Sequence, residues 1–399
     1  MKTLFALPSS RSLRRSLPIL LGIALSGVTV SSIADARIAV PTESAIVVQQ
    51  QPKIQLAILL DTSSSMDGLI DQARNQLWQV VNEFSRTEKN GKTPTLEVAV
   101  YEYGNSHLSA KSGYIRQVVS LTSELDKVSE ALFSLTTSGG DEYCGYAIRT
   151  ASTDLQWSST ADDIKAIFIA GNEPFTQGPV AYKTAVLAAK EKGITVNTIH
   201  AGAYELGLSS GWQHGASLAG GNYMSIDHNH QVAHIITPQD SELVALNNQL
   251  NNTYIPYGKR GHSSALRQRE QDSKNSKVSV GLMAKRAVSK ASSMYKNEGW
   301  DLVDAWTSKR VKLKDLDDKA LPAKMQAMNL QEKKDYVRNK QQQRQQLQEK
   351  IRALSVARDQ YVAKEKAAAP TAEASTMHDA LSASIRKESE QKGFILKQK

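Results

Sequence analysis

Short apolar runs alternate with longer amphipathic stretches between Ile54 and about Tyr257. The short runs have the continuous apolar character of strands that are buried on both faces of a parallel sheet. In the longer stretches, apolar residues recur with the spacing of an amphipathic helix. This alternation predicts an α/β domain over residues 54–257 that is doubly wound and Rossmann-like, with a mainly parallel central sheet.

The pattern assigns each run to a core strand or to a shorter strand at the sheet edge. Core strands are expected at residues 55–60, 96–103, 165–170, 194–200 and 222–226, and the edge strand at residues 114–121. Helices are expected at residues 68–86, 124–135, 144–155, 179–192 and 241–252, with a short helix at residues 212–219.

The pattern changes after Tyr257. Residues 258–279 are basic and polar without apolar periodicity, which predicts a linker. Residues 280–366 return to helical spacing and are expected to form a helical hairpin or coiled-coil-like arm, in which the long second helix pairs with residues 280–304. Its apolar seam is sparse for an autonomous coiled coil. Pro370 ends this region, and residues 367–399 are expected to form a tail with a short helix.

The N-terminus has the three parts of a secretory signal. Basic residues from Lys2 to Arg15 precede an apolar stretch at residues 17–30, and Ala34-Asp35-Ala36 forms a small-x-small cleavage site. We therefore expect a signal peptide over residues 1–36, cut after Ala36, and a flexible lead-in over residues 37–53. An uncleaved membrane anchor is the alternative. No later segment has the roughly 20 uninterrupted apolar residues of an integral membrane span, which favours a periplasmic or secreted chain of a bacterial envelope.

Charge and cysteine content narrow the class of protein. The 399-residue chain carries a formal net charge of +9 and a single cysteine. Cys144 has no partner for an internal disulfide, and we expect it to be buried as a small apolar residue. Acidic residues are interleaved with the lysines and arginines of the C-terminal region, which is typical of a solvated helix face. With secretion expected as well, nucleic acid is not predicted as a partner.

The apolar run from Leu56 to Leu60 ends in a motif that carries candidate chemistry. Asp61, Ser63 and Ser65 place three oxygen-bearing side chains at alternate positions directly after this strand. Ligands of open α/β sheets bind beyond the carboxyl ends of the strands. One carboxylate and two hydroxyls suit a hard divalent cation such as Mg²⁺. The alternative is an ordinary cluster of helix-capping side chains.

This strand and its Asp-x-Ser-x-Ser motif resemble the metal-ion-dependent adhesion site of the von Willebrand factor type A domain, and the resemblance covers residues 53–252. The loops at residues 101–105, 114–118, 139–145 and 171–175 look like those of a secreted bacterial subgroup of this family. The resemblance implies the fold described above and a site for Mg²⁺ or another divalent cation.

The family's two other metal-binding loops are matched less closely. The second loop carries a Thr or Asp just before a helix, where Asp141 aligns most naturally and Thr137 is the alternative. The third loop is usually Thr-Asp-Gly, but Gly171-Asn172-Glu173 stands here, so the site is expected to be degenerate. The resemblance implies metal ligands at Asp61, Ser63, Ser65, Asp141 and Glu173, and partner contacts at Thr137 and Asn172.

The expected function is a non-catalytic protein-binding module, either adhesive or scaffolding, in which an acidic residue of an envelope partner completes the metal shell. Two alternatives stay open: a structural protein that acts in envelope assembly through the helical arm, and a hydrolase of envelope polymers that uses Asp141, Glu142 and Glu173. The sequence has no Ser-His-Asp, His-Glu-x-x-His or phosphate-loop arrangement. The histidines of residues 228–234 lack zinc-site spacing, and a surface loop is expected there.

Overall fold

A six-stranded sheet with the order β4-β3-β1-β5-β6-β7 lies at the centre of residues 53–226. All neighbouring strands are parallel except β4, which pairs antiparallel with β3 at the edge. The five expected core strands and the expected edge strand are confirmed. Their bounds are β1 (Lys53–Asp61), β3 (Thr95–Tyr103), β4 (Ile115–Thr122), β5 (Ile164–Gly171), β6 (Thr195–Ala201) and β7 (Tyr223–Ile226).

The computed structural model describes residues 51–227, 235–368 and 376–396, which all belong to one compact unit, Gln50–Lys399. The expected signal peptide at residues 1–36 and residues 37–50 of the expected lead-in lie outside the described residues, as do the histidines of residues 228–234. Nowhere in the described ranges is a helix both long and apolar enough to cross a membrane.

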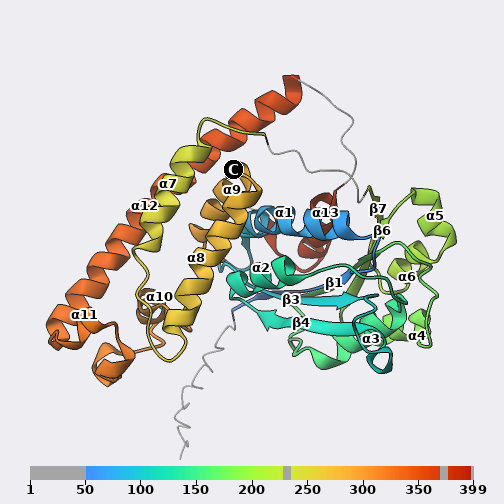
Figure 1. Cartoon of the computed structure of the whole chain (residues 1–399), viewed down its shortest axis with the longest axis horizontal. Coiled ribbons are helices and arrows are strands. Elements are labelled where there is room, and N and C mark those ends of the chain that lie inside the picture. The colour runs from blue at the N-terminus through green and yellow to red at the C-terminus, as the bar shows by residue number, and fades with distance from the viewer. Residues whose placement is uncertain (1–50, 228–234, 369–375, 397–399) are drawn as a thin grey trace, which may run out of the picture. The chain divides into compact units, whose positions relative to one another are not determined.

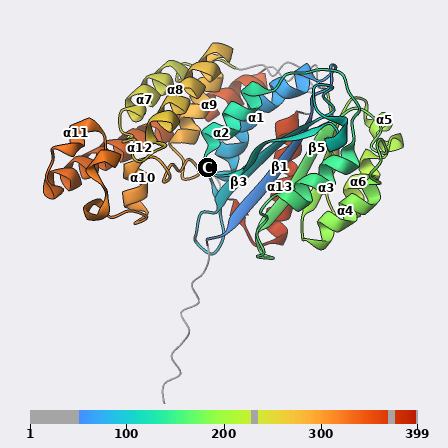
Figure 2. The same ribbon diagram turned by 60° about the horizontal axis from the view of Figure 1, so that its bottom comes forward.

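Helices cover both faces of the sheet (Figure 2). The pleat of β1 supplies both cores, because Leu56 and Ile58 face one side while Ala57 and Leu59 face the other. The first side is covered by α1 (Asp67–Phe84), α2 (Leu125–Ser134) and α13 (Met377–Gln391), and the second by α3 (Cys144–Asp154), α4 (Tyr182–Glu191) and α6 (Trp212–Leu218). This is the doubly wound α/β fold that the sequence predicts.

The C-terminal helix is part of this α/β domain, so the described residues 376–396 do not form the tail that was expected over residues 367–399. Met377, Leu381 and Ile385 of α13 are buried, and the helix packs on α1, β5 and β6. After α13, β8 (Ile395–Leu396) pairs antiparallel with β2 (Thr87–Glu88), which follows α1. The expected helix is present, but an amphipathic stripe does not identify the surface that covers it.

The expectation of a linker at residues 258–279 is wrong, because α8 (Gly261–Val278) is a continuous helix. Its buried side is almost entirely polar, which leaves no apolar stripe for a sequence pattern to reveal. Partners on other helices hold these polar groups: Gln271 accepts from Ser129 of α2 at 2.9 Å, and Asn275 accepts from the Trp78 indole of α1 at 2.7 Å.

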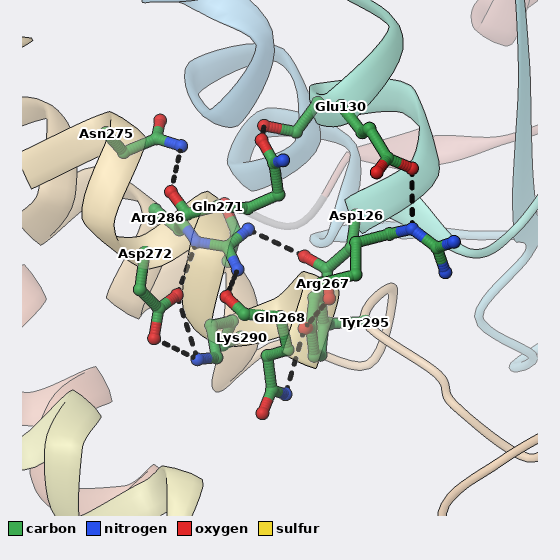
Figure 3. Close-up of polar contacts among 12 residues, drawn as sticks. Asp126, Glu130, Arg267, Gln268, Gln271, Asp272, Asn275, Arg286, Lys290 and Tyr295 are labelled. Atoms are coloured by element: carbon green, nitrogen blue, oxygen red, sulfur yellow. Dashed lines mark hydrogen bonds and ion pairs between the residues drawn. The ribbon is translucent and has the colours of Figure 1, made fainter. Parts of the chain in front are cut away.

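A buried polar cluster joins α2, α8 and α9 (Val280–Lys290), as Figure 3 shows. The Arg286 guanidinium donates to Asp126 of α2 at 2.8 Å and to Asp272 of α8 at 2.6 Å. Lys290 lies 3.0 Å from the same Asp272 carboxylate, and the Tyr295 hydroxyl donates to Asp126 at 2.5 Å. Pairing of opposite charges is what makes such burial tolerable. The cluster therefore fixes the helical region to the α/β domain.

The long helix expected in the C-terminal arm is α12 (Leu330–Ala368), which packs along several helices of the same chain (Figure 1). It reaches residues 280–304, as expected, where Arg344 pairs with Asp301 at 2.7 Å and Arg352 donates to the Ala291 carbonyl at 3.1 Å. Its neighbours are α9, α10 (Leu302–Thr307) and α7 (Asp240–Asn251), and the short α11 (Ala323–Gln326) precedes it.

Candidate metal centre

Three neighbouring strands end side by side at the carboxyl edge of the sheet. β1 ends at Asp61, which pairs in register with Tyr103, the last residue of β3. On the other side, β5 ends at Gly171, one position beyond the pair of Leu60 with Ala170. The loops that follow these strands therefore meet, at the position where open α/β sheets bind their ligands.

The Asp61 carboxylate is fully buried in the first of these loops. Its Oδ1 accepts a hydrogen bond from the backbone N–H of Ser63 at 2.7 Å, and the Ser63 hydroxyl lies beside the carboxylate. The N-cap residue of α1 is Met66, and its side chain makes no capping bond. None of the three oxygen-bearing residues therefore occupies the N-cap position that the helix-capping alternative requires.

A second buried carboxylate, that of Glu142, lies against Asp61. Glu142 is only 5% exposed, and its side chain lies next to Asp61 and Ser63. Its backbone N–H donates to Gln177 Oε1 at 2.9 Å, which holds the loop before α3 in place. Glu142 is not among the metal ligands that the sequence predicts. The Gly-rich loop before a helix was the correct signal, but a sequence does not tell which of two adjacent acidic side chains turns inward.

Ser65 and Asn172 lie together at the rim of this centre, where Asn172 Nδ2 donates to Ser65 Oγ at 3.3 Å. Ser65 is exposed, and Asn172 is partly buried. Burial raises the pKa of Asp61, and the negative charge of Glu173, the exposed residue after Asn172, raises it further. Four of the predicted site residues (Asp61, Ser63, Ser65 and Asn172) are thus brought together, with Glu173 nearby.

Two predicted site residues make other contacts. Asp141 is exposed, and its carboxylate accepts a hydrogen bond from the Tyr143 hydroxyl at 3.1 Å. Thr137 donates to the Asp67 carboxylate at the start of α1, at 2.7 Å. Neither contact is to Asp61 or Ser63, so the second loop reaches the centre through Glu142.

Several oxygens of the centre are buried without a hydrogen-bond donor. Within the described part of the chain, Asp61 Oδ2, Ser63 Oγ, Glu142 Oε2 and Asn172 Oδ1 have no hydrogen-bond partner. Burial raises the pKa of both Glu142 and Asp61, and the adjacent Asp61 carboxyl raises that of Glu142 further. Two carboxylates in contact need a shared proton or a cation between them. A divalent cation would satisfy the same oxygens, so this donor set fits the ion that the sequence predicts.

The set combines two carboxylates with neutral oxygens. The described residues include no group of three or more His, Cys, Asp or Glu side chains arranged to hold a metal ion. An oxygen-only set of this kind suits Mg²⁺, Mn²⁺ or Ca²⁺ better than a thiophilic metal.

Tyr103 and Cys144 form the apolar wall beneath the centre. The Tyr103 hydroxyl donates to the Ala170 carbonyl at 2.9 Å, and the Cys144 thiol lies 3.8 Å from the same hydroxyl oxygen. Cys144 is buried, as expected, and burial raises the pKa of its thiol. The thiol therefore stays protonated at neutral pH and is not available as a thiolate ligand.

The fold and the position of this centre define a doubly wound α/β domain with a candidate metal site at the carboxyl ends of its strands. Residues 55–218 match the sequence model of the von Willebrand factor type A domain, and this part of the chain is a member of that family. Such domains are commonly protein-interaction modules and often bind a divalent metal ion. No curated protein matches the chain in sequence.

Several solved structures resemble part of the chain. Proximal thread matrix protein 1 from the mussel byssus is 14% identical with a TM-score of 0.34, and the match covers 44% of this chain and 41% of the mussel protein. BatB from Bacteroides thetaiotaomicron is 18% identical with a TM-score of 0.34, covering 44% of this chain and 90% of BatB. The pilus adhesin SpaC from Lactobacillus rhamnosus GG is 16% identical with a TM-score of 0.32, covering 53% of this chain and 33% of SpaC.

Proposed function

We propose that this chain is a non-catalytic protein-binding module in which a divalent cation, Mg²⁺ or a similar ion, links the domain to an acidic residue of its partner. The observation that carries the proposal is the group of buried oxygens without donors at the strand ends, which includes Asp61 Oδ2 and Ser63 Oγ. Asp61, Ser63 and Ser65 would hold the ion. When bound, it would supply a positive charge with a free coordination position, which attracts a carboxylate.

The surroundings of the centre favour a protein partner over a small anion. The short helix α5 (Tyr204–Ser209) follows β6 at the same edge of the sheet and exposes two large apolar side chains. Tyr204 is 49% exposed and Leu206 is 57% exposed. Gly207 of this helix lies against the His200 ring, and His200 Nε2 is 3.3 Å from the carbonyl oxygen of Asn172 at the rim. Exposed apolar side chains next to a polar centre are typical of protein interfaces.

The proposed location is the bacterial periplasm or the extracellular space, and the proposed subgroup is the secreted one with a degenerate adhesion site. The N-terminal pattern that ends at Ala36 supports export. The degenerate third loop is supported by the sequence Gly171-Asn172-Glu173, which places no Asp where the family usually has one.

Calorimetric titration with Mg²⁺, Mn²⁺ and Ca²⁺ tests the metal step. Wild type should bind at least one of these ions, and Ser65→Ala should weaken binding because it removes a ligand oxygen. Ser64→Ala is the matched control, since Ser64 is also exposed and lies in the same loop but outside the motif. Absence of metal-dependent heat in wild type would overturn the proposed cation site.

Capture of envelope proteins by the full chain, with and without chelator, tests the partner step. The binding module predicts chelator-sensitive capture that is lost in Ser65→Ala and kept in Ser64→Ala. Capture that is unchanged by chelator and depends on residues 280–399 would instead indicate the assembly role of the helical arm. Turnover of an envelope polymer would indicate the hydrolase.

A further inference from the structure

Two positions in this chain could correspond to the aspartate of the family's third loop: Asn172, which carries a neutral amide, and Gly171, which has no room for a side chain. Gly171 occupies the end of β5, and a Cβ atom there would lie 2.4 Å from the Tyr103 hydroxyl and 3.1 Å from Asp61 Oδ2. Tyr103 is fixed by its bond to the Ala170 carbonyl, so it is not free to move aside. An aspartate at position 171 would therefore need the sheet end to be rebuilt.

The space for a second carboxylate lies on the other side of Asp61. Gly104, just after β3, has φ +79°, and a Cβ atom there would lie 2.7 Å from Glu142 Cγ and 2.9 Å from Asp61 Oδ1. The glycine thus leaves the room that the Glu142 side chain fills. Left-handed backbone of this kind is cheap only for glycine.

The position of Glu142 is set by its backbone and by the start of α3. Its N–H is held by Gln177, and its carbonyl accepts from the Cys144 N–H at 3.2 Å. The first turn of α3 is packed tightly, since a Cβ atom on Gly145 would lie 2.2 Å from the Val180 carbonyl oxygen. This packing aims the Glu142 carboxyl at Asp61 while Asp141 points to Tyr143 at the surface.

We infer that Glu142 is the second metal-binding carboxylate of the site and replaces the aspartate that the third loop lacks. This inference rests on the proposed function. Asp61 and Glu142 together carry two negative charges in a buried setting, which a divalent cation balances. The two carboxylates approach the ion from the β1 loop and the α3 loop. The side that faces Ser65 and Asn172 is then left for water or for the carboxylate of the partner.

Metal titration of charge-removing variants of the full chain tests this inference. Glu142→Gln should lower the affinity for Mn²⁺ or Mg²⁺ roughly tenfold to hundredfold or more, because an anionic ligand is lost. Asp141→Asn is the matched control: it removes the same charge from the adjacent position and should change affinity by less than about threefold, since an exposed charge is screened by solvent. Glu173→Gln should behave like this control.

The melting temperature of the cation-free variants separates ligand from scaffold. Glu142→Gln should melt at or above the temperature of cation-free wild type, because its amide donates to Asp61 where two carboxylates otherwise compete. Metal binding in wild type with unchanged affinity in Glu142→Gln would overturn this inference alone. A loss of metal affinity in Asp141→Asn but not in Glu142→Gln would also overturn it. The same holds if cation-free Glu142→Gln melts well below cation-free wild type, because the loss of affinity would then reflect a damaged fold. No binding in wild type would overturn the proposed function as well.

Discussion

Single glycines decide where the side chains of the metal centre lie. Gly104 leaves room for Glu142 on one side of Asp61, and Gly171 leaves room for Tyr103 on the other. In the sequence both are unremarkable residues after apolar strands, because the contact that each would make depends on loops far away in the chain. The Asp-x-Ser-x-Ser motif could be read directly, since its spacing along one loop determines its geometry.

The substitution Gly104→Ala tests this steric role against Gly91→Ala. Gly91 has nearly the same backbone conformation, φ +70°, but a Cβ atom on it would meet nothing within 4 Å. Gly91→Ala should therefore cost only the conformational strain of about 1 kcal/mol in the free energy of unfolding. Gly104→Ala should cost roughly 1–3 kcal/mol more through crowding of Glu142 and Asp61, and it should weaken metal binding. Urea unfolding measures the loss of stability, and metal titration measures the loss of affinity. If Gly104→Ala and Gly91→Ala lost equal stability and affinity, the steric role of Gly104 would be contradicted.

At the scale of the element, charged and polar residues occupy helix positions where a pattern search expects apolar ones. The buried face of α12 repeats every seven residues as Val337, Arg344, Ile351 and Arg358. Two of these four positions are arginine, so the seam looks sparse in the sequence. Both arginines can be buried because each pairs with an acidic residue: Arg344 with Asp301 at 2.7 Å and Arg358 with Asp240 at 2.7 Å. The helix α8 was not predicted for the same reason, because its buried face is polar.

The charged cluster that holds α8 and α9 should make stability depend on acid pH. Burial alone would raise the pKa of Asp272, but Lys290 and Arg286 hold it well below its usual range. A depressed folded-state pKa stabilises the protein fully above the unfolded value of about 4 and loses that stabilisation as the pH falls toward the folded value. At pH 7, Asp272→Asn should lose roughly 3–5 kcal/mol, because it leaves buried cations without their partner.

Urea unfolding between pH 7 and pH 2.5 measures the difference in the free energy of unfolding between wild type and Asp272→Asn. This difference should become smaller below about pH 4. Glu270→Gln is the control on the same helix, because Glu270 is exposed and its pair with Lys274 is 3.4 Å long. A surface pair of this kind is worth about 0–1 kcal/mol. A difference for Asp272→Asn that stays constant down to pH 2.5 would contradict the role of the ionised Asp272.

At the scale of the whole molecule, the α/β domain is closed by residues from the far end of the chain. Along the chain, the helices α7 to α12 come after β7 and before α13, so a large helical region precedes the last helix of the domain. α13 is tied to α1 by polar bonds as well as apolar packing: Ser382 and Arg386 both bond the buried Glu83. The helix α13 (Met377–Gln391) is therefore a structural part of the α/β domain.

Substitutions on α13 test this closure. Ile385→Asp places a charge in the core between the helix and the sheet, where Ile385 is fully buried, and should destabilise the domain by several kcal/mol. Ala383→Asp introduces the same residue at an exposed position of the same helix and should change stability by about 0.5 kcal/mol or less. Thermal unfolding and hydrogen exchange of β5 report both. Full protection of β5 in Ile385→Asp would show that α13 is not needed to close the domain.

The sequence by itself determined the strands, the helices of the α/β domain and the adhesion-site motif, because these depend on periodicity and spacing within short segments. Asp61, Ser63 and Ser65 were found in this way, and the register of β1 with its neighbours places them at the sheet edge. Only the tertiary structure decided that Glu142 rather than Asp141 faces Asp61, that α8 is a helix, and that α13 returns to the sheet. Each of these depends on a partner distant in the chain: a glycine that leaves space, a buried charge that pairs with a polar face, or an apolar surface that an amphipathic helix covers. Local patterns carry no information about such partners, and burial and pairing settle them only when the whole chain is folded.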